Sequence, residues 1–490
     1  MRKLDMAPDE FRALGHRLVD RIAEHMARMP GGPVTRDETG TVVRHALQAE
    51  RGLPDAGTES DRLLETAADL LFDHSLFNGH PRFFGYITSS PAPIGALGDL
   101  LASAVNQNCG SWILAPMATE IEAQTVRWIA ELIGFPHARG ESPGLLVSGG
   151  NMANFVCFLA ARAAKSGWDV RKSGIGGTHP RMVMYASSET HTWIQKAADL
   201  FGFGTDAIRW IPVDERQRMN TSELRLRIEA DRASGNQPFL VVGTAGSVST
   251  GAVDPLSEIA AICREQDLWF HVDGAYGAFA AAIPGAPADL RAMAEADSVA
   301  VDPHKWLYAP LEAGCALVRR PADLRQAFSY HPPYYHFDEE ALNFVDYGPQ
   351  NSRGFRALKV WLALQQIGRA GYVDSIGEDM RLSRKLFDLL RNHPEFEALT
   401  QGLSIATFRY VPTHLRSKLG DPAVEASLNT LNKDLLARVE QSGQAFFSNA
   451  VVNGRYAMRA CIVNFRTSDA DIEAVPELVA AFGRAAQRDA

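Results

Sequence analysis

The sequence predicts an α/β fold built around a mostly parallel β-sheet with helices on both faces. Between about residues 90 and 320, short apolar runs of strand length alternate with segments long enough for crossover helices. Of the 490 residues, 46% are hydrophobic and 22% are charged, which is the balance of an ordinary globular protein. A chain of this length exceeds the size of a single hydrophobic core, so we expect more than one domain.

Residues 1–85 are predicted to form a helical N-terminal segment. Apolar residues recur at helical spacing from Phe11 to Met26, and the sequence PGGP at 30–33 ends that helix. A second amphipathic stretch covers about 61–75. Because this short segment offers its apolar stripe no obvious partner of its own, we expect the stripe to pack on the main domain or on a second subunit.

The large domain is predicted to span residues 86–370 and to contain the parallel sheet. Six buried strands are expected, at 144–147, 181–185, 239–243, 268–272, 297–301 and 314–318. Ligands of such sheets bind where the strands end, so polar residues just after these runs are the first candidates for a site. Residues 330–352 lack a clear period and are predicted to form a long surface loop, with a helix following at about 353–368.

The remaining residues, 371–490, are predicted to form a smaller α+β C-terminal domain. Helical segments alternate there with apolar stretches of strand length, at 404–409 and 456–465.

Charge and cysteine content exclude several classes of protein. Forty-nine Lys and Arg against 58 Asp and Glu give a net charge of −9, which argues against a nucleic-acid partner. The sequence contains no apolar run near the ~18 residues of a membrane span, and no secretory leader is evident, so no membrane partner is expected. The five cysteines form no CxxC pair and no cluster with histidine, which excludes a recognisable metal site and favours reduced, buried thiols in the cytoplasm.

Two opposite charges follow neighbouring predicted strands. Lys305 stands in VDPHKW (301–306), and Asp273 stands in HVDGAYG (271–277). A lysine in apolar surroundings loses hydration of its charge, and its amine becomes a usable nucleophile. Each residue alone has an ordinary explanation, a surface lysine at a strand end or a carboxylate in a turn. Together they suit a cofactor with an electrophilic carbon and a basic ring nitrogen.

Two further motifs complete the pattern. In VSGGNMAN (147–154) a strand runs into small residues and then into a helix N-terminus, where backbone N–H groups and the helix dipole favour a phosphate. His191 follows another strand, and its flat ring could stack on a planar cofactor, although a histidine there is more often purely structural. Phosphate, planar ring, ring nitrogen and aldehyde together specify pyridoxal 5′-phosphate (PLP).

These motifs resemble those of the group II PLP-dependent decarboxylases, the family of aromatic-L-amino-acid, histidine and glutamate decarboxylases. HVDGAYG and VDPHKW carry the resemblance, with SGGNMAN, SSETH (187–191) and TAGSVSTGAVDP (244–255) in matching order. It covers about residues 10–485. It implies the PLP-dependent transferase fold type I, which is the aspartate-aminotransferase type, and a homodimer with its active sites at the interface.

The resemblance also implies roles for single residues. Lys305 matches the Schiff-base lysine, Asp273 the partner of the pyridine nitrogen, and His191 the histidine stacked on the ring. The other matching positions are Ala275 on the opposite ring face, Gly150, Asn151, Asp302 and His304 around the phosphate, Tyr334 as the proton donor in a mobile loop, and Tyr86, Ile87 and Ser89 beside the substrate.

We therefore expect a PLP-dependent decarboxylase that releases CO₂ from an L-amino acid and yields the amine. Aromatic residues in and near the predicted substrate loop favour an aromatic or apolar amino acid: Phe83, Phe84, Tyr86 and Trp112. Aldehyde synthesis, another carbon–carbon lyase reaction and transamination remain alternatives on the same site. A PLP-fold binding protein without turnover is a further alternative, against which the retained Lys305 argues.

Overall fold

The predicted apolar runs form the main sheet in a computed structural model that describes residues 4–331 and 341–489. The sheet has seven strands in the order β1-β7-β6-β5-β4-β2-β3. Strand β7 runs antiparallel to both of its neighbours, and the other adjacent pairs are parallel, so the predicted mostly parallel sheet is confirmed. The strands are β1 (Gly144–Val147), β2 (Met182–Ser187), β3 (Ile208–Ile211), β4 (Gln237–Thr244), β5 (Trp269–Asp273), β6 (Ser298–Val301) and β7 (Gly314–Val318).

Strand β3 was not predicted, because it lies at the sheet edge and lacks a continuous apolar run. Its two isoleucines are buried, but between them Arg209 is half-buried and Trp210 is exposed. Pairing with β2 on one side is enough to hold this short strand in register.

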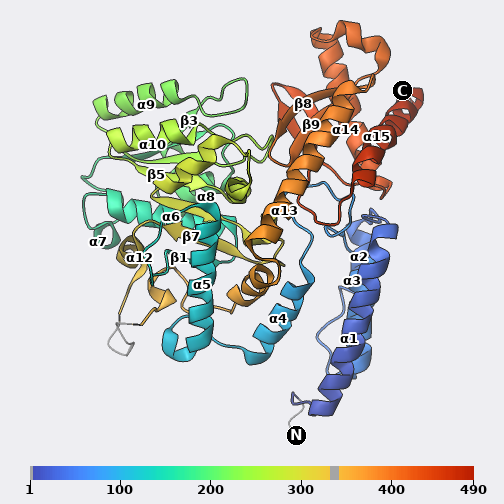
Figure 1. Cartoon of the computed structure of the whole chain (residues 1–490), viewed down its shortest axis with the longest axis horizontal. Coiled ribbons are helices and arrows are strands. Elements are labelled where there is room, and N and C mark those ends of the chain that lie inside the picture. The colour runs from blue at the N-terminus through green and yellow to red at the C-terminus, as the bar shows by residue number, and fades with distance from the viewer. Residues whose placement is uncertain (1–3, 332–340, 490) are drawn as a thin grey trace.

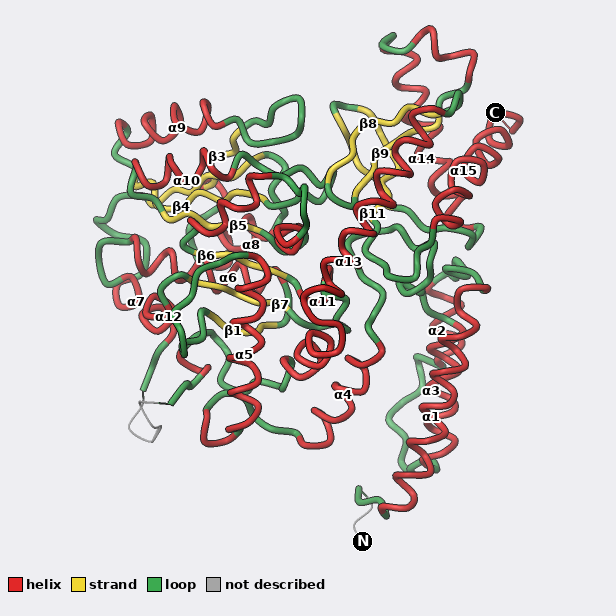
Figure 2. Tube along the Cα trace, viewed as in Figure 1, coloured by secondary structure: helices red, strands yellow, loops and turns green. Residues whose placement is uncertain are grey.

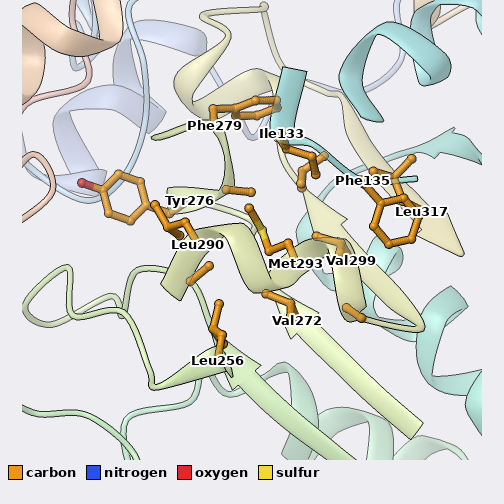
Figure 3. Packing of buried hydrophobic residues seen from close by; sticks show 14 of the residues in the cluster. Ile133, Phe135, Leu256, Val272, Tyr276, Phe279, Leu290, Met293, Val299 and Leu317 are labelled. Atoms are coloured by element: carbon orange, nitrogen blue, oxygen red, sulfur yellow. The ribbon is translucent and has the colours of Figure 1, made fainter. Parts of the chain in front are cut away.

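Helices cover both faces of the sheet because neighbouring strand residues point in opposite directions (Figure 1). Leu146 and Leu317 pack with α5 and α10 on one face, whereas Leu145 and Ala316 pack with α6 and α8 on the other. Figure 3 shows part of the first cluster. The helices of this domain are α4 (Pro93–Val105), α5 (Pro116–Ile133), α6 (Gly150–Lys165), α7 (Val170–Ser173), α8 (Trp193–Leu200), α9 (Thr221–Ala233), α10 (Leu256–Glu265), α11 (Pro303–Trp306) and α12 (Pro321–Phe328).

A long helix, α13 (Ala357–Asn392), connects the large domain to the C-terminal domain (Figure 2). Gly368, with φ of 63°, interrupts its helical conformation. Before this break Val360 packs in the core of the large domain, and near its end Leu386 packs in the core of the C-terminal domain. The predicted boundary between residues 370 and 371 lies two residues after this break.

The C-terminal domain is an antiparallel sheet, ordered β10-β11-β9-β8, packed against helices. The strands predicted at 404–409 and 456–465 correspond to β9 and β11, although β11 ends at Cys461. Strand β8 was not predicted, because most of its residues are only half-buried. The elements are β8 (Phe396–Gly402), β9 (Ile405–Tyr410), α14 (Pro422–Gln441), β10 (Ser448–Val452), β11 (Arg455–Cys461) and α15 (Asp469–Asp489).

The N-terminal helices form an arm that extends away from both domains (Figure 1). They are α1 (Pro8–Arg28), α2 (Gly40–Leu47) and α3 (Ser60–Asp73). Ion pairs join α1 to α3, with Arg17 2.5 Å from Asp61. Large apolar side chains of the arm stay exposed, including Phe11 at 58% and Leu71 at 63%.

After the arm, residues 80–86 run along the C-terminal domain. The Phe84 N–H donates to the Phe446 carbonyl at 2.7 Å, and the Phe84 carbonyl accepts from the Cys461 N–H at 2.9 Å. Asn464 Nδ2 donates to the carbonyl of His80 at 2.8 Å across 384 residues of chain. The beginning and the end of the chain are therefore joined in one domain.

The burial predicted for the cysteines is confirmed for all five of them. In the described ranges, 4–331 and 341–489, helices are too short or too polar to cross a membrane.

Candidate active site

The carboxyl ends of the parallel strands converge on a cavity of about 370 Å³. Its wall contains residues that follow β1, β2, β4, β5 and β6, as the topology of a parallel sheet leads us to expect. Nine of the residues proposed from the sequence line it: Ile87, Gly150, Asn151, His191, Asp273, Ala275, Asp302, His304 and Lys305.

Lys305 lies on the single turn of α11, directly after β6. Its Nζ lies 3.0 Å from Oδ2 of Asp302, whose side chain is 2% exposed. The other Asp302 oxygen, Oδ1, is buried and has no hydrogen-bond partner in the described part of the chain. His304 Nε2 lies 3.7 Å from the same Oδ2, and burial lowers the pKa of His304. Lys305 is thus the basic group nearest this carboxylate.

Asp273 ends β5 and is held by two donors. Trp193 Nε1 donates to Oδ2 at 2.8 Å, and the Ala275 N–H donates to Oδ1 at 3.2 Å. With 7% of its surface exposed, the side chain presents a fixed negative charge on the cavity wall. Such a charge stabilises a protonated ring nitrogen next to it.

His191 lies between β2 and α8, on the cavity wall. Its Nδ1 accepts from the backbone N–H of Trp193 at 3.3 Å, and partial burial lowers the pKa of the ring. Trp193 therefore contacts both His191 and Asp273. The sequence analysis missed this residue, although it stands only two positions after His191.

The cavity wall at the start of α6 suits a phosphate group. Gly150 begins α6, a 16-residue helix whose N-terminal N–H groups favour an anion. A Cβ at Gly150 would lie 2.6 Å from Asp302 Oδ2 and 3.2 Å from the Ala275 Cβ, so only glycine leaves room here. Thr244 Oγ1, also on the cavity wall, is buried and unpaired among the described residues. The residues present fit a phosphorylated planar cofactor.

The three residues assigned to the substrate side occupy different positions. Ile87 lines the cavity. Tyr86 is 59% exposed, and its backbone N–H donates to Ser448 Oγ at 2.6 Å. Ser89 Oγ donates to the carbonyl of His304 at 2.8 Å and so supports the turn that carries Lys305. Tyr334, proposed as the proton donor, lies outside the described residues.

Two of the aromatic residues that suggested an aromatic substrate serve the core instead. Phe84 is fully buried and packs against Phe447 at 5.3 Å between ring centroids. Phe83 stacks on Phe446 at 5.4 Å. The interpretation of these two rings as facing the substrate was therefore wrong, because aromatic residues near a site and in a core look alike in sequence.

Arg459 on β11 is a buried cation that the sequence analysis did not consider. It is 4% exposed, and its Nη1 donates to the carbonyl of Val248, a cavity residue, at 2.5 Å. Its Nε has no partner among the described residues, and burial lowers its pKa. An arginine within the apolar strand sequence YAMRAC was the available signal.

Comparisons with known proteins agree with this geometry. The model of the pyridoxal-dependent decarboxylase conserved domain matches residues 44–411. An aromatic-L-amino-acid decarboxylase of Bacillus atrophaeus is 33% identical over 470 residues, which cover 95% of this chain and 94% of that protein. A phenylacetaldehyde synthase of a Rosa hybrid cultivar is 28% identical over 470 residues, with coverage of 93% and 90%.

The fold agrees as well. The crystal structure of Oryza sativa TDC with PLP and tryptamine superposes with a TM-score of 0.89 at 26% identity, covering 98% of each chain. The predicted fold type I is therefore confirmed. The chain belongs to the pyridoxal-dependent decarboxylase family and is a carboxy-lyase that uses PLP to remove CO₂ from an amino acid.

Proposed function

We propose that the substrate is an aromatic L-amino acid and that the product is the corresponding amine. The full-length similarity to an aromatic-L-amino-acid decarboxylase carries this proposal. The charge of the cavity supports it, since the wall contains the carboxylates of Glu189, Asp273, Asp302 and Glu312, of which Asp302 pairs with Lys305 and Glu312 with Arg356. A substrate with an acidic side chain would be repelled by this wall.

A screen of amine release over the standard L-amino acids tests this proposal. We expect kcat/KM for phenylalanine, tyrosine or tryptophan to exceed that for glutamate at least about 100-fold, the discrimination of roughly 3 kcal/mol that a mismatched polar group imposes. A preference for glutamate or aspartate would contradict the substrate assignment.

We propose the following roles for the residues around the cofactor. PLP, when bound, supplies an aldehyde that combines with amines and a ring that accepts the electrons released with CO₂. Lys305 Nζ would hold the aldehyde of PLP in exchange with amines. Asp273 would favour a proton on the ring nitrogen, and Trp193 holds the Asp273 carboxylate in place.

The other proposed residues bind and orient. His191 and Ala275 would flank the two faces of the ring, both being on the cavity wall. The N-terminus of α6, at Gly150 and Asn151, would hold the phosphate, and Asp302 and His304 would complete that end. Closing such a site to water disfavours the charge of the leaving carboxylate and so favours its loss.

Tyr334 is proposed as the group that protonates the substrate carbon after CO₂ departs. We expect Tyr334→Phe to lose amine release by about 10²- to 10⁴-fold, the usual contribution of a positioned proton donor, while PLP stays bound. Product chromatography and the visible absorption band measure the two quantities. Tyr330→Phe is the control, because that ring lies beneath the guanidinium of Arg171 at 3.9 Å. Normal amine yield from Tyr334→Phe would remove this role.

Aldehyde synthesis is the second candidate, favoured by the similarity to a phenylacetaldehyde synthase. Amine and aldehyde products separate by chromatography, so the same screen distinguishes them. An amine that accumulates in step with CO₂ supports the first proposal.

We also propose a homodimer with the divisions 1–85, 86–370 and 371–490, in which the arm packs on the partner. The exposed apolar residues of the arm and of α4, such as Leu97 at 52% and Leu101 at 54%, support this. Sedimentation should give twice the chain mass of 53.5 kDa. A stable monomer at micromolar concentration would contradict it.

We propose a cytoplasmic location, because five free thiols suit a reducing compartment. Cell fractionation tests that location.

A further inference from the structure

We propose that Asp379 on α13 is a positioning residue, which holds the turn that carries Lys305 and links this turn to the C-terminal domain. The inference rests on the proposed role of Lys305. Asp379 does not line the cavity, and it is 1% exposed. It therefore acts through other residues.

The carboxylate of Asp379 bonds two residues just after Lys305. Its Oδ2 accepts from Trp306 Nε1 at 2.9 Å and from the Tyr308 hydroxyl at 2.7 Å. The backbone N–H of Asn464, in the C-terminal domain, lies near enough to lower the pKa of this carboxyl. One buried side chain thus joins the segment after Lys305 to the loop that follows β11.

The segment that Asp379 holds has little internal support. Helix α11 is four residues long, and Tyr308 just beyond it has φ of 53°, a left-handed conformation that a tyrosine rarely adopts. The hydroxyl of Tyr372, also on α13, donates to the carbonyl of Leu307 at 3.1 Å. Because so short a helix cannot fix its own orientation, the contacts from α13 add to those of Ser89 in determining where Lys305 points.

A second set of contacts ties the same turn to the C-terminal domain. The indole of Trp306 stacks on the ring of Tyr276, with centroids 4.9 Å apart, and Tyr276 lines the cavity. The Tyr276 hydroxyl bonds Ser404 Oγ at 2.6 Å and accepts from the Ser404 N–H at 2.9 Å, just before β9. Trp306 is therefore held between a cavity residue and Asp379.

The chemistry of the contacts favours a carboxylate at position 379. Trp306 and Tyr308 both donate to Oδ2, and the Asn464 N–H also favours the ionised form. An amide has one accepting oxygen, so an asparagine that served the two side-chain donors would turn its NH₂ toward the Asn464 N–H. Burial, with a smaller contribution from Glu378, raises the pKa of Asp379 to about 7, and the hydrogen bonds from Tyr308 and Trp306 act in the opposite direction and so favour the ionised carboxylate. A residue whose only role was to fill the space at position 379 would not need a carboxylate.

The test compares Asp379→Asn with Glu378→Gln in the purified full-length protein. Glu378 is the adjacent carboxylate, paired with Arg381 on the surface. PLP is removed, and its rebinding is followed by absorbance, while the melting temperature of the PLP-free protein is recorded. We expect Asp379→Asn to weaken PLP binding about 10- to 100-fold, the loss of a hydrogen bond to a charged group, and Glu378→Gln to bind normally.

A merely structural role would give a different pattern. The melting temperature of Asp379→Asn would then fall while the folded protein still bound PLP as tightly as the wild type, and this result would overturn the proposal. If Asp379→Asn does not fold, Tyr308→Phe removes one donor and leaves Trp306 in place. This variant should bind PLP several-fold more weakly, and wild-type binding by it would equally reject the idea.

The proposed function can fail separately. If Lys305→Ala binds PLP with the wild-type absorption band, the role of Lys305 is wrong. If Lys305→Ala changes that band but Asp379→Asn does not weaken binding, only the positioning role of Asp379 is wrong.

Discussion

Lys305→Ala is expected to abolish decarboxylation, with kcat lower by about 10⁴-fold or more, as when a group that bonds the reacting partner is removed from an active site. The amine is the cavity group able to combine with an aldehyde, and alanine leaves Asp302 buried without its cation at 3.0 Å. The absorption band of bound PLP should therefore change with the activity.

Amine release and absorbance measure the effect of Lys305→Ala, and circular dichroism verifies its fold. Lys172→Ala is the matched control, since this lysine is exposed and lies in α7 away from the cavity. Substantial turnover by Lys305→Ala would refute the assignment of the central amine.

Asp273→Asn is expected to lower kcat by about 10²- to 10³-fold, the usual effect of deleting one preorganised electrostatic group. Asparagine keeps the shape of the side chain and can still accept a hydrogen bond from Trp193 Nε1, which lies 2.8 Å from Asp273 Oδ2 in the wild-type protein. What it loses is the negative charge that keeps a proton on the ring nitrogen. The loss should appear in kcat more than in KM, because the substrate's own contacts are unchanged.

Steady-state kinetics with the best substrate of the screen measures this loss. Asp231→Asn is a suitable comparison, because Asp231 is another buried carboxylate, paired with Arg209 at 2.9 Å on the far edge of the sheet. It should lower stability and leave kcat near the wild-type value. Equal kinetic losses in both variants would show that Asp273 acts through folding alone.

The parallel strands and the residues at their ends could be predicted because both follow from local patterns. Buried strands have continuous apolar runs, and a parallel sheet places all its carboxyl ends at one edge. The predicted strand ends therefore placed His191, Asp273 and Lys305 at one edge of the sheet. The structure brings these three residues together in one cavity.

Contacts made across the chain could not be predicted in this way. Asp379 lies 73 residues from Trp306, and Arg459 lies 211 residues from Val248. Neither pairing follows from a period or a motif, since each depends on how the C-terminal domain packs against the large one. The prediction that Phe84 faces the substrate was wrong for the same reason, because its partner Phe447 comes from the other end of the chain.

The joining of residues 80–86 to the C-terminal domain has a consequence for synthesis on the ribosome. The bond from Asn464 to His80 closes only after nearly the whole polypeptide has emerged, and such a long closure is slow. Until then the rings of Phe83 and Phe84 lack their partners and are exposed to aggregation. We expect nascent chains of this enzyme to depend on chaperones and to acquire the vitamin B6 coenzyme only after release.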